Sequence, residues 1–187
     1  GNIGAEWKVS EVIKKAADKG VPLRIGVNGG SLPGHLKKDT PRSLAMVKAA
    51  EEELDICRRH GYEQLVFSLK SSDIEDTVQA NILFSNRYPF PLHIGITEAG
   101  PAQTSAVKST LGLSELLKLG IGDTIRVSAS AEPAEEVSIG RCILENLGLV
   151  QASINIISCP RCGRTTFDVS RFLSDIDIYL HRKDISA

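Results

Sequence analysis

PLHIGITEAGPAQTSAVKSTLGLSELLKLGIGDTIRVS (residues 91–128) contains a complete strand–helix–strand unit. Residues 91–97 form a short apolar run that predicts a buried strand, and residues 104–119 have the apolar spacing of a helix. Gly120 ends that helix, and residues 123–128 predict a second strand. Two strands joined by a helix of this length are expected to run parallel, because parallel neighbours need a long crossover connection.

The same alternation of strands and helices extends in both directions from this unit. Further strands are predicted at residues 21–28, 64–69 and 153–158, and further helices at residues 8–19, 41–60, 73–86, 133–147 and 168–179. Four consecutive strand–helix units predict an α/β fold with a parallel sheet covered by helices. A doubly wound nucleotide-binding sheet would carry a glycine-rich phosphate loop, but the chain has neither GxGxxG nor GxxxxGK[ST]. A TIM barrel is favoured, because polar residues gather at the C-terminal ends of successive strands.

The composition argues against several classes of function. The 187 residues include 22 basic and 23 acidic side chains, a net charge of −1, so we expect no surface for nucleic acid. Hydrophobic residues make up 42% of the chain, but no apolar run approaches the roughly 20 residues that a membrane helix needs. The chain begins with Gly1 and contains one methionine, Met46, so we expect a processed or internal piece of a longer protein.

Polar side chains are predicted on four strands, Arg24 and Arg126 within a strand and the others at C-terminal strand ends, and they are Arg24, Asn28, Lys70, Glu98, Arg126 and Ser128. Lys70, Glu98 and Arg126 follow one another at intervals of 28 residues, about the length of one barrel unit, so we expect them at similar heights. Two guanidinium groups and an ammonium on one rim predict binding of a phosphate or diphosphate, because arginine matches these oxygens bidentately. Glu98 in such surroundings is a candidate to hold a charge or relay a proton.

A structural role for these residues stays open at this point. Arg24–Glu98 or Lys70–Glu98 could be an ordinary ion pair at a solvated rim. His93 lies among apolar neighbours, which predicts a packed, hydrogen-bonded histidine rather than a ligand. The acidic run at residues 51–53 predicts a solvated helix face.

Cys159 and Cys162 form a CxxC motif directly after the apolar run 154–157. Two thiolates at this spacing can hold one metal ion or cluster, and a reducing cytoplasm is the expected compartment. Cys57 and Cys142 lie in helical patterns and are predicted to be small buried hydrophobes. A structural zinc ion or an iron–sulfur cluster needs further ligands, so the chain is expected to supply half of such a site. A redox-active dithiol is the remaining interpretation.

Several motifs together resemble 4-hydroxy-3-methylbut-2-enyl diphosphate synthase, an enzyme family of the methylerythritol phosphate route to isoprenoids. They are RIGVN (24–28), GS (30–31), SLKSSD (68–73), PLHIGITEAGP (91–101), SAVKS (105–109), GIGDTIRVS (120–128) and ISCPRCGR (157–164). The resemblance implies a TIM (β/α)8 barrel followed by a small iron–sulfur domain. It also implies the reductive opening of 2-C-methyl-D-erythritol 2,4-cyclodiphosphate. Electrons from ferredoxin or flavodoxin would pass through a 4Fe–4S cluster held by three cysteines and a glutamate.

When the family's residue roles are assigned to the matching positions, the resemblance implies diphosphate or substrate contacts for Arg24, Asn28, Lys70, Arg126 and Ser128. Glu98 takes a catalytic position close to the reacting part of the substrate, and Cys159 and Cys162 take the positions of two cluster ligands. Residues 1–150 would form the C-terminal half of the barrel, about four βα units. Residues 151–187 would begin the iron–sulfur domain.

We therefore expect a piece of this cytoplasmic reductase that is catalytically inert by itself. Enzymes of the common bacterial type are dimers, and the open sheet edges of a half barrel also predict self-association into a homo-oligomer. The expected partners are the cyclic diphosphate and ferredoxin or flavodoxin, with no nucleic acid and no membrane. The alternative is a non-catalytic phosphate-binding α/β module with a structural zinc ion at the CxxC.

Overall fold

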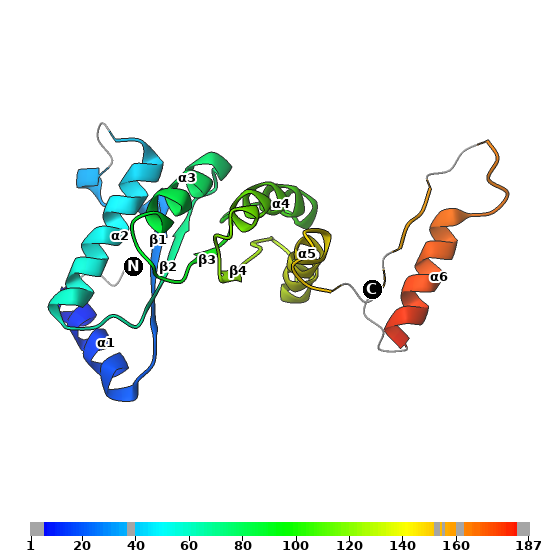
Figure 1. Cartoon of the computed structure of the whole chain (residues 1–187). Helices are drawn as coiled ribbons and strands as arrows, with labels where there is room; N and C mark the ends of the chain where they lie inside the picture. The colour runs from blue at the N-terminus through cyan, green and yellow to red at the C-terminus, as the bar shows by residue number, and fades with distance from the viewer. Residues whose placement is uncertain (1–5, 37–39, 152–153, 155, 160–162, 183–187) are drawn as a thin grey trace. The chain divides into compact units, whose positions relative to one another are not determined.

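The computed structural model describes residues 6–36, 40–151, 154, 156–159 and 163–182, and the chain divides into two compact units, Gly1–Ile143 and Leu144–Ala187. Helices and strands alternate through the first unit (Figure 1). In chain order the elements are α1 (Glu6–Lys19), β1 (Leu23–Asn28), η1 (Gly29–Ser31), η2 (Gly34–Leu36), α2 (Arg42–Arg59), β2 (Leu65–Lys70), α3 (Ile74–Ser85), β3 (His93–Ile94), α4 (Ala102–Lys118), β4 (Thr124–Ile125), α5 (Pro133–Asn146) and α6 (Val169–Arg182).

The strands of the first unit run parallel and neighbour one another in chain order. β1 pairs with β2, and β3 pairs with β4. A parallel bridge between Phe67 and Leu92 joins the two pairs. The Thr97 amide donates to the Ser71 carbonyl at 3.1 Å, the bond expected when Ser71 is level with Ile96, so the register between β2 and β3 persists four residues beyond the bridge. The described strands therefore lack the reversal of order that marks a doubly wound sheet.

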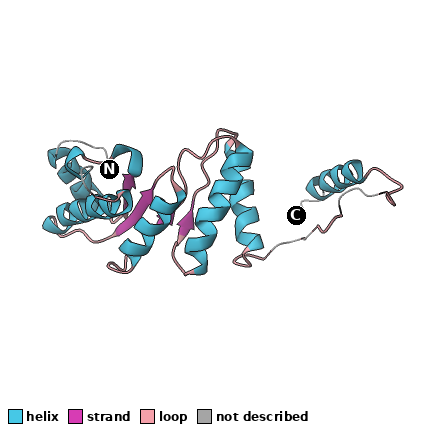
Figure 2. Ribbon diagram, turned by 90° about the horizontal axis from the view of Figure 1, so that it is seen from above, coloured by secondary structure: helices cyan, strands magenta, loops and turns pink. Residues whose placement is uncertain are grey.

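Helices α3, α4 and α5 pack against one face of the strands. Alternate strand residues point to the same face, and the register makes Phe67, Ile96 and Ile125 members of one set. Each of these three helices contacts that set. Phe84 of α3 packs on Phe67, with ring centroids 4.7 Å apart. Gly112 of α4 lies against Ile96, and Gly140 of α5 lies against Ile125 and Val127. Helices on one side of sequential parallel strands are the arrangement of a barrel wall. Figure 2 shows the strands together with the helices of this unit from above.

The opposite side of the strands, which we call the polar face, carries the predicted charged residues. Asn28 is the register partner of Lys70. The register carried over from β2 places Gly95 level with Lys70, and the next strand brings Arg126 level with Gly95. Apolar residues thus face the helices, and Lys70 and Arg126 face away from them.

The α/β class is confirmed, but several predicted strands are shorter or absent. The described residues form no closed barrel. Regular pairing covers two residues in each of β3 and β4, where the sequence predicted 91–97 and 123–128. The strand predicted at 153–158 is wrong over its described residues, which are irregular. Ile157 is 89% exposed, because the second unit offers no described strand to pair with this apolar run.

The second unit is built around α6, which leaves large apolar side chains such as Phe172 and Tyr179 exposed. Ring contacts between Phe167 and Phe172, with centroids 5.8 Å apart, order the entry to this helix. The predicted boundary at residue 150 and the start of an iron–sulfur domain both stay predictions. Across the described residues, every helix is too short or too polar to pass through a membrane.

Close backbone approach at Gly95 yields a testable prediction. A side-chain carbon added at this buried residue would collide with the carbonyl oxygen of Arg126. We therefore expect Gly95→Ala to lower the free energy of unfolding by about 3 kcal/mol, because the backbone at Arg126, directly after β4, cannot move aside without strain. Gly26→Ala is the matched control, since Gly26 lies on the same polar face with open space around it. Urea denaturation followed by circular dichroism measures both variants, and equal unfolding midpoints would contradict the prediction.

Candidate functional site

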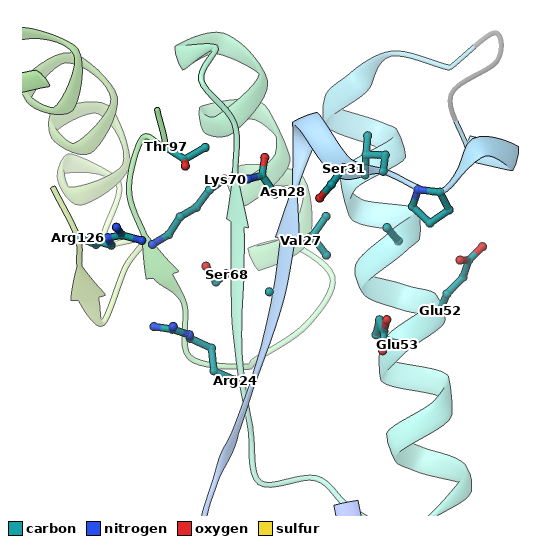
Figure 3. Close-up of a pocket in the computed structure, with 14 residues that line it drawn as sticks. Arg24, Val27, Asn28, Ser31, Glu52, Glu53, Ser68, Lys70, Thr97 and Arg126 are labelled. Atoms are coloured by element: carbon teal, nitrogen blue, oxygen red, sulfur yellow. The ribbon is translucent and has the colours of Figure 1, made fainter. Parts of the chain in front are cut away.

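A pocket of about 430 Å³ opens on the polar face of the strands. Arg24, Lys70 and Arg126 reach into it from β1, from β2 and from the residue after β4 (Figure 3). The predicted residue Asn28 also lines the pocket, as do Ser68 and Thr97. The structure therefore brings together four of the six residues that the sequence predicted for substrate binding and catalysis.

The turn from β2 into α3 holds Lys70 in place through buried hydrogen bonds. The Asn81 side chain of α3 donates to the Leu69 carbonyl at 2.8 Å, next to Lys70. The Ser71 amide donates to the Thr77 hydroxyl at 2.9 Å, and that hydroxyl donates back to the Ser71 carbonyl. Because these polar groups are buried, breaking one of their bonds costs its full desolvation energy. The strand end is therefore rigid.

The Lys70 amine lies over Gly95 and extends toward Arg126 (Figure 3). A side-chain carbon at residue 95 would be 3.5 Å from Nζ, so the glycine leaves room for this path. Burial, together with the charges of the nearby Arg126 and Arg24 guanidinium groups, lowers the pKa of Lys70 to about 8. Three cationic side chains thus share one partly desolvated space.

None of these three cations pairs with a carboxylate among the described residues, and the alternatives Arg24–Glu98 and Lys70–Glu98 are not formed. Glu52 and Glu53 line the pocket from α2, away from the Lys70–Arg126 end (Figure 3). Unpaired cations that converge in a desolvated space favour a multiply charged anion between them.

Asn28 combines a structural contact with its place in the pocket. Its side-chain oxygen accepts a hydrogen bond from the Gly30 amide at 3.0 Å and so caps η1. Its register partner is Lys70, which lies on the same face. The oxygen is used in the turn, so the side-chain amide nitrogen is the group suited to face a ligand.

Glu98 and Ser128 lie outside the lining of this pocket. The predicted equal height is confirmed for Lys70 and Arg126 but is wrong for Glu98, because the residue level with them is Gly95. Glu98 is exposed and has a φ of +53°, a left-handed backbone conformation that is uncommon without glycine and is concentrated at functional sites. The Ser128 carbonyl accepts a hydrogen bond from the Ser105 hydroxyl at 2.8 Å, which ties it to α4.

His93 lies on the polar face near the pocket but outside its lining, whereas the sequence predicted only a packed histidine. Its Nδ1 lies 2.8 Å from the Thr124 hydroxyl, so the predicted hydrogen bonding is confirmed. Burial is the largest cause that lowers the pKa of His93 to about 4, and the positive charges of Lys70, Arg24 and Arg126 contribute to the same shift. His93 is therefore neutral near pH 7 and adds no fourth charge. Its position two residues before Gly95, on the same face, is the sequence signal for this placement.

The acidic run of α2 is more than the solvated face that the sequence predicted. Glu51 accepts hydrogen bonds from Arg87 at 2.9 Å and from the Tyr88 hydroxyl at 3.1 Å, which join α2 to the end of α3. Glu52 lies 2.8 Å from His35. These contacts are tertiary and join residues that are far apart in the sequence.

The cysteines separate into different environments. Cys57 is buried as predicted, whereas Cys142 is exposed on α5, so that prediction was wrong. Cys159 is a free, exposed thiol in an irregular segment, and Cys162 lies outside the described residues. No group of three His, Cys, Asp or Glu residues within the described ranges is placed to hold a metal ion. The soft CxxC thiolates suit two positions of an iron–sulfur cluster and leave the others to further residues.

Comparison with known families agrees with this geometry. A profile described as the GcpE TIM-barrel domain matches residues 1–141. The chain belongs to the GcpE TIM-barrel domain family. The matched range contains all six predicted substrate and catalytic residues, and membership in the GcpE family favours the barrel over a zinc-binding phosphate module.

Relatives named 4-hydroxy-3-methylbut-2-en-1-yl diphosphate synthase (flavodoxin) are similar along nearly the whole chain. The protein from Thermodesulfovibrio yellowstonii is 47% identical over 178 residues, which cover 94% of this chain and 51% of the relative. The protein from Geobacter sulfurreducens is 46% identical, covering 96% and 54%. The protein from Exiguobacterium sibiricum is 39% identical, covering 100% and 51%. The chain spans about half the length of the curated relatives it matches.

The lowered pKa of Lys70 predicts how pH affects stability. Lys70 titrates near pH 8 in the fold and near 10.5 when unfolded, so between these values the unfolded chain binds more protons. The contribution of this group to stability therefore rises with pH across that window. We expect Lys70→Met to be more stable than the unchanged chain at about pH 7, with the difference shrinking toward pH 10. Thermal unfolding measures this difference, with Lys118→Met, on the exposed end of α4, as the control for loss of one lysine. A pH-independent difference for Lys70→Met would contradict the prediction.

Proposed function

We propose that this chain provides the diphosphate-binding face of a 4-hydroxy-3-methylbut-2-en-1-yl diphosphate synthase. The observation that carries the proposal is the convergence of Arg24, Lys70 and Arg126, unpaired with any described carboxylate, in one pocket of a GcpE-family fold. The substrate would be 2-C-methyl-D-erythritol 2,4-cyclodiphosphate, whose reductive ring opening yields the product that the names of the relatives state.

Each polar-face residue has a chemically suitable role in binding that substrate. Arg24, Lys70 and Arg126 would contact diphosphate oxygens, where two guanidinium groups give directional bonds and the ammonium adds a point charge. Asn28 and Ser128 would donate further hydrogen bonds from the ends of their strands. A bound diphosphate would draw Lys70 back toward its charged form, because an opposite charge stabilises the ammonium.

Glu98 is proposed as the catalytic residue beside the reacting carbons. Its support is the left-handed backbone at φ +53°, in the turn that follows β3 at the C-terminal end of the strands. Barrel enzymes place their reacting groups at this end. The carboxylate would hold or deliver a proton as the ring oxygen leaves.

Cys159 and Cys162 are proposed to hold two positions of a 4Fe–4S cluster. When bound, such a cluster supplies electrons one at a time. The exposed, unbridged thiol of Cys159 supports this assignment. Flavodoxin is the proposed electron donor rather than ferredoxin, because the relatives' names state flavodoxin. A cytoplasmic setting is proposed because it keeps such thiols reduced.

Diphosphate binding is the decisive test of the proposal. We expect the chain to bind inorganic diphosphate and the cyclic diphosphate, and Arg126→Ala to weaken both by roughly 10- to 100-fold, as expected for loss of a charge-assisted contact. Arg141→Ala, on α5 away from the pocket, is the matched control. Isothermal titration calorimetry measures the affinities, and equal binding by both variants would overturn the assignment.

The homo-oligomer expected from the sequence is also proposed here. Light scattering on the same samples tests it, and a monodisperse monomer would contradict it.

Catalytic inertness of the isolated chain is a separate prediction. After anaerobic treatment with iron and sulfide, we expect no turnover of the cyclic diphosphate with reduced flavodoxin, because a CxxC provides too few cluster ligands. The relative from Thermodesulfovibrio yellowstonii, treated identically, serves as the active control. Product formation by the 187-residue chain would show that its own residues suffice.

A further inference from the structure

The Lys70 amine is the one amino group of the described pocket lining, and its surroundings suit a reaction as well as an ion pair. It projects over Gly95, where no side chain blocks it, and it points toward Arg126 (Figure 3). Arg24 lies on the other side, on β1. An anion held by these guanidinium groups would therefore have the amine beside it.

The electrostatic environment keeps a substantial fraction of this amine uncharged. Desolvation and the two arginines bring the pKa of Lys70 to about 8, and neutral His93 on β3 does not oppose them. The pocket carboxylates, Glu52 and Glu53, come from α2, away from the amine (Figure 3). Uncharged lysine is the nucleophilic form, as in enzymes that activate lysine by burial beside another cation.

We propose that Lys70 is an acylation site for small acyl phosphates, and that acylation switches off the anion-binding pocket. The inference rests on the proposed function, because the same Arg24 and Arg126 would hold the phosphate of the reagent. Binding an acyl phosphate by its phosphate group places the carbonyl carbon within reach of the amine, which converts an encounter in solution into a reaction within a complex.

The reaction balances without any further reagent. The nitrogen lone pair of Lys70 attacks the carbonyl carbon, and a carbon–nitrogen bond forms. The carbon–oxygen bond to the phosphate breaks, and inorganic phosphate leaves with that electron pair. The proton lost by the amine goes to the departing phosphate or to water. The product is a neutral amide at Lys70, so the pocket loses one of its three cations and gains the bulk of an acyl group.

A phosphate bound in the pocket raises the pKa of Lys70, against the lowering by burial and by the arginines, and so affects how the acylation rate depends on pH. Its negative charge favours the ammonium form, so the pKa of Lys70 in the complex lies above its value in the empty pocket. The acylation rate should therefore keep rising with pH above about 8. Among the described residues, Arg24, Arg126, Glu52 and Glu53 are the charged groups that line the pocket with Lys70, and His93 is the titratable group on the neighbouring strand.

Acetyl phosphate is the probe for the first experiment. The chain is incubated with it at about pH 8, and peptide mass spectrometry follows acetylation at each lysine over time. We expect Lys70 to react at least about tenfold faster than exposed Lys118, because the two arginines would hold the reagent beside an amine that partial burial keeps partly uncharged. Inorganic diphosphate should suppress the reaction at Lys70 and leave Lys118 unchanged. Reaction at Lys70 no faster than at Lys118, or no protection by diphosphate, would overturn the inference.

A second measurement asks whether acylation switches off the pocket. Treatment with acetyl phosphate should abolish diphosphate binding by the unchanged chain and by Lys118→Arg, and the loss of binding should follow the fraction of chain that is acetylated at Lys70. Retained binding in a fully Lys70-acetylated chain would overturn the switch. Untreated chain that fails to bind diphosphate would contradict the proposed function itself. Normal binding with slow acetylation would contradict the acylation site alone.

Discussion

The parallel register between neighbouring strands is the constraint on which the rest of the structure depends. It places Lys70 level with Gly95 and Arg126 on one face and sets Phe67 and Ile94 toward the helices on the other. Side chains alternate along a strand, so a slip by one residue would exchange the two faces. Gly95 permits this register, because any side chain there would meet the carbonyl oxygen of Arg126. The same strand register therefore fixes both the backbone pairing and the positions of the cations.

The gathered cations work against the stability of the chain that holds them. Arg24, Lys70 and Arg126 repel one another, and partial burial deprives Lys70 of water that would stabilise its charge. No described carboxylate relieves this repulsion. The rigid parts around them explain how the arrangement persists: the buried bonds of Asn81 and Thr77 at the end of β2, and the aromatic packing of Phe67 on Phe84. A bound anion would offset the repulsion between the cations. The free energy recovered in this way would strengthen anion binding.

Much of the fold was predictable because its signals are local. Gly20, Gly61 and Gly120, all with positive φ, follow helices that the sequence located within about two residues. The failed strand at residues 153–158 has the right composition but no described partner in its unit, and pairing is a tertiary property. Likewise, Cys142 has helical spacing yet lies on the exposed side of α5, because periodicity does not say which neighbours a helix will have.

The candidate site also separates what the sequence predicts from what tertiary contacts decide. The sequence by itself determined the alternation of strands and helices, the charged residues at the strand ends and the CxxC, because these follow from residue type and spacing. Only the tertiary structure decided that Lys70 and Arg126 stand level while Glu98 lies three residues beyond, and that His93 lies neutral beside them. Equal spacing along the chain cannot reveal these differences, because the height of a residue depends on the hydrogen-bond register between strands. The charge state of a group depends on burial and on neighbours that the fold brings from elsewhere in the chain.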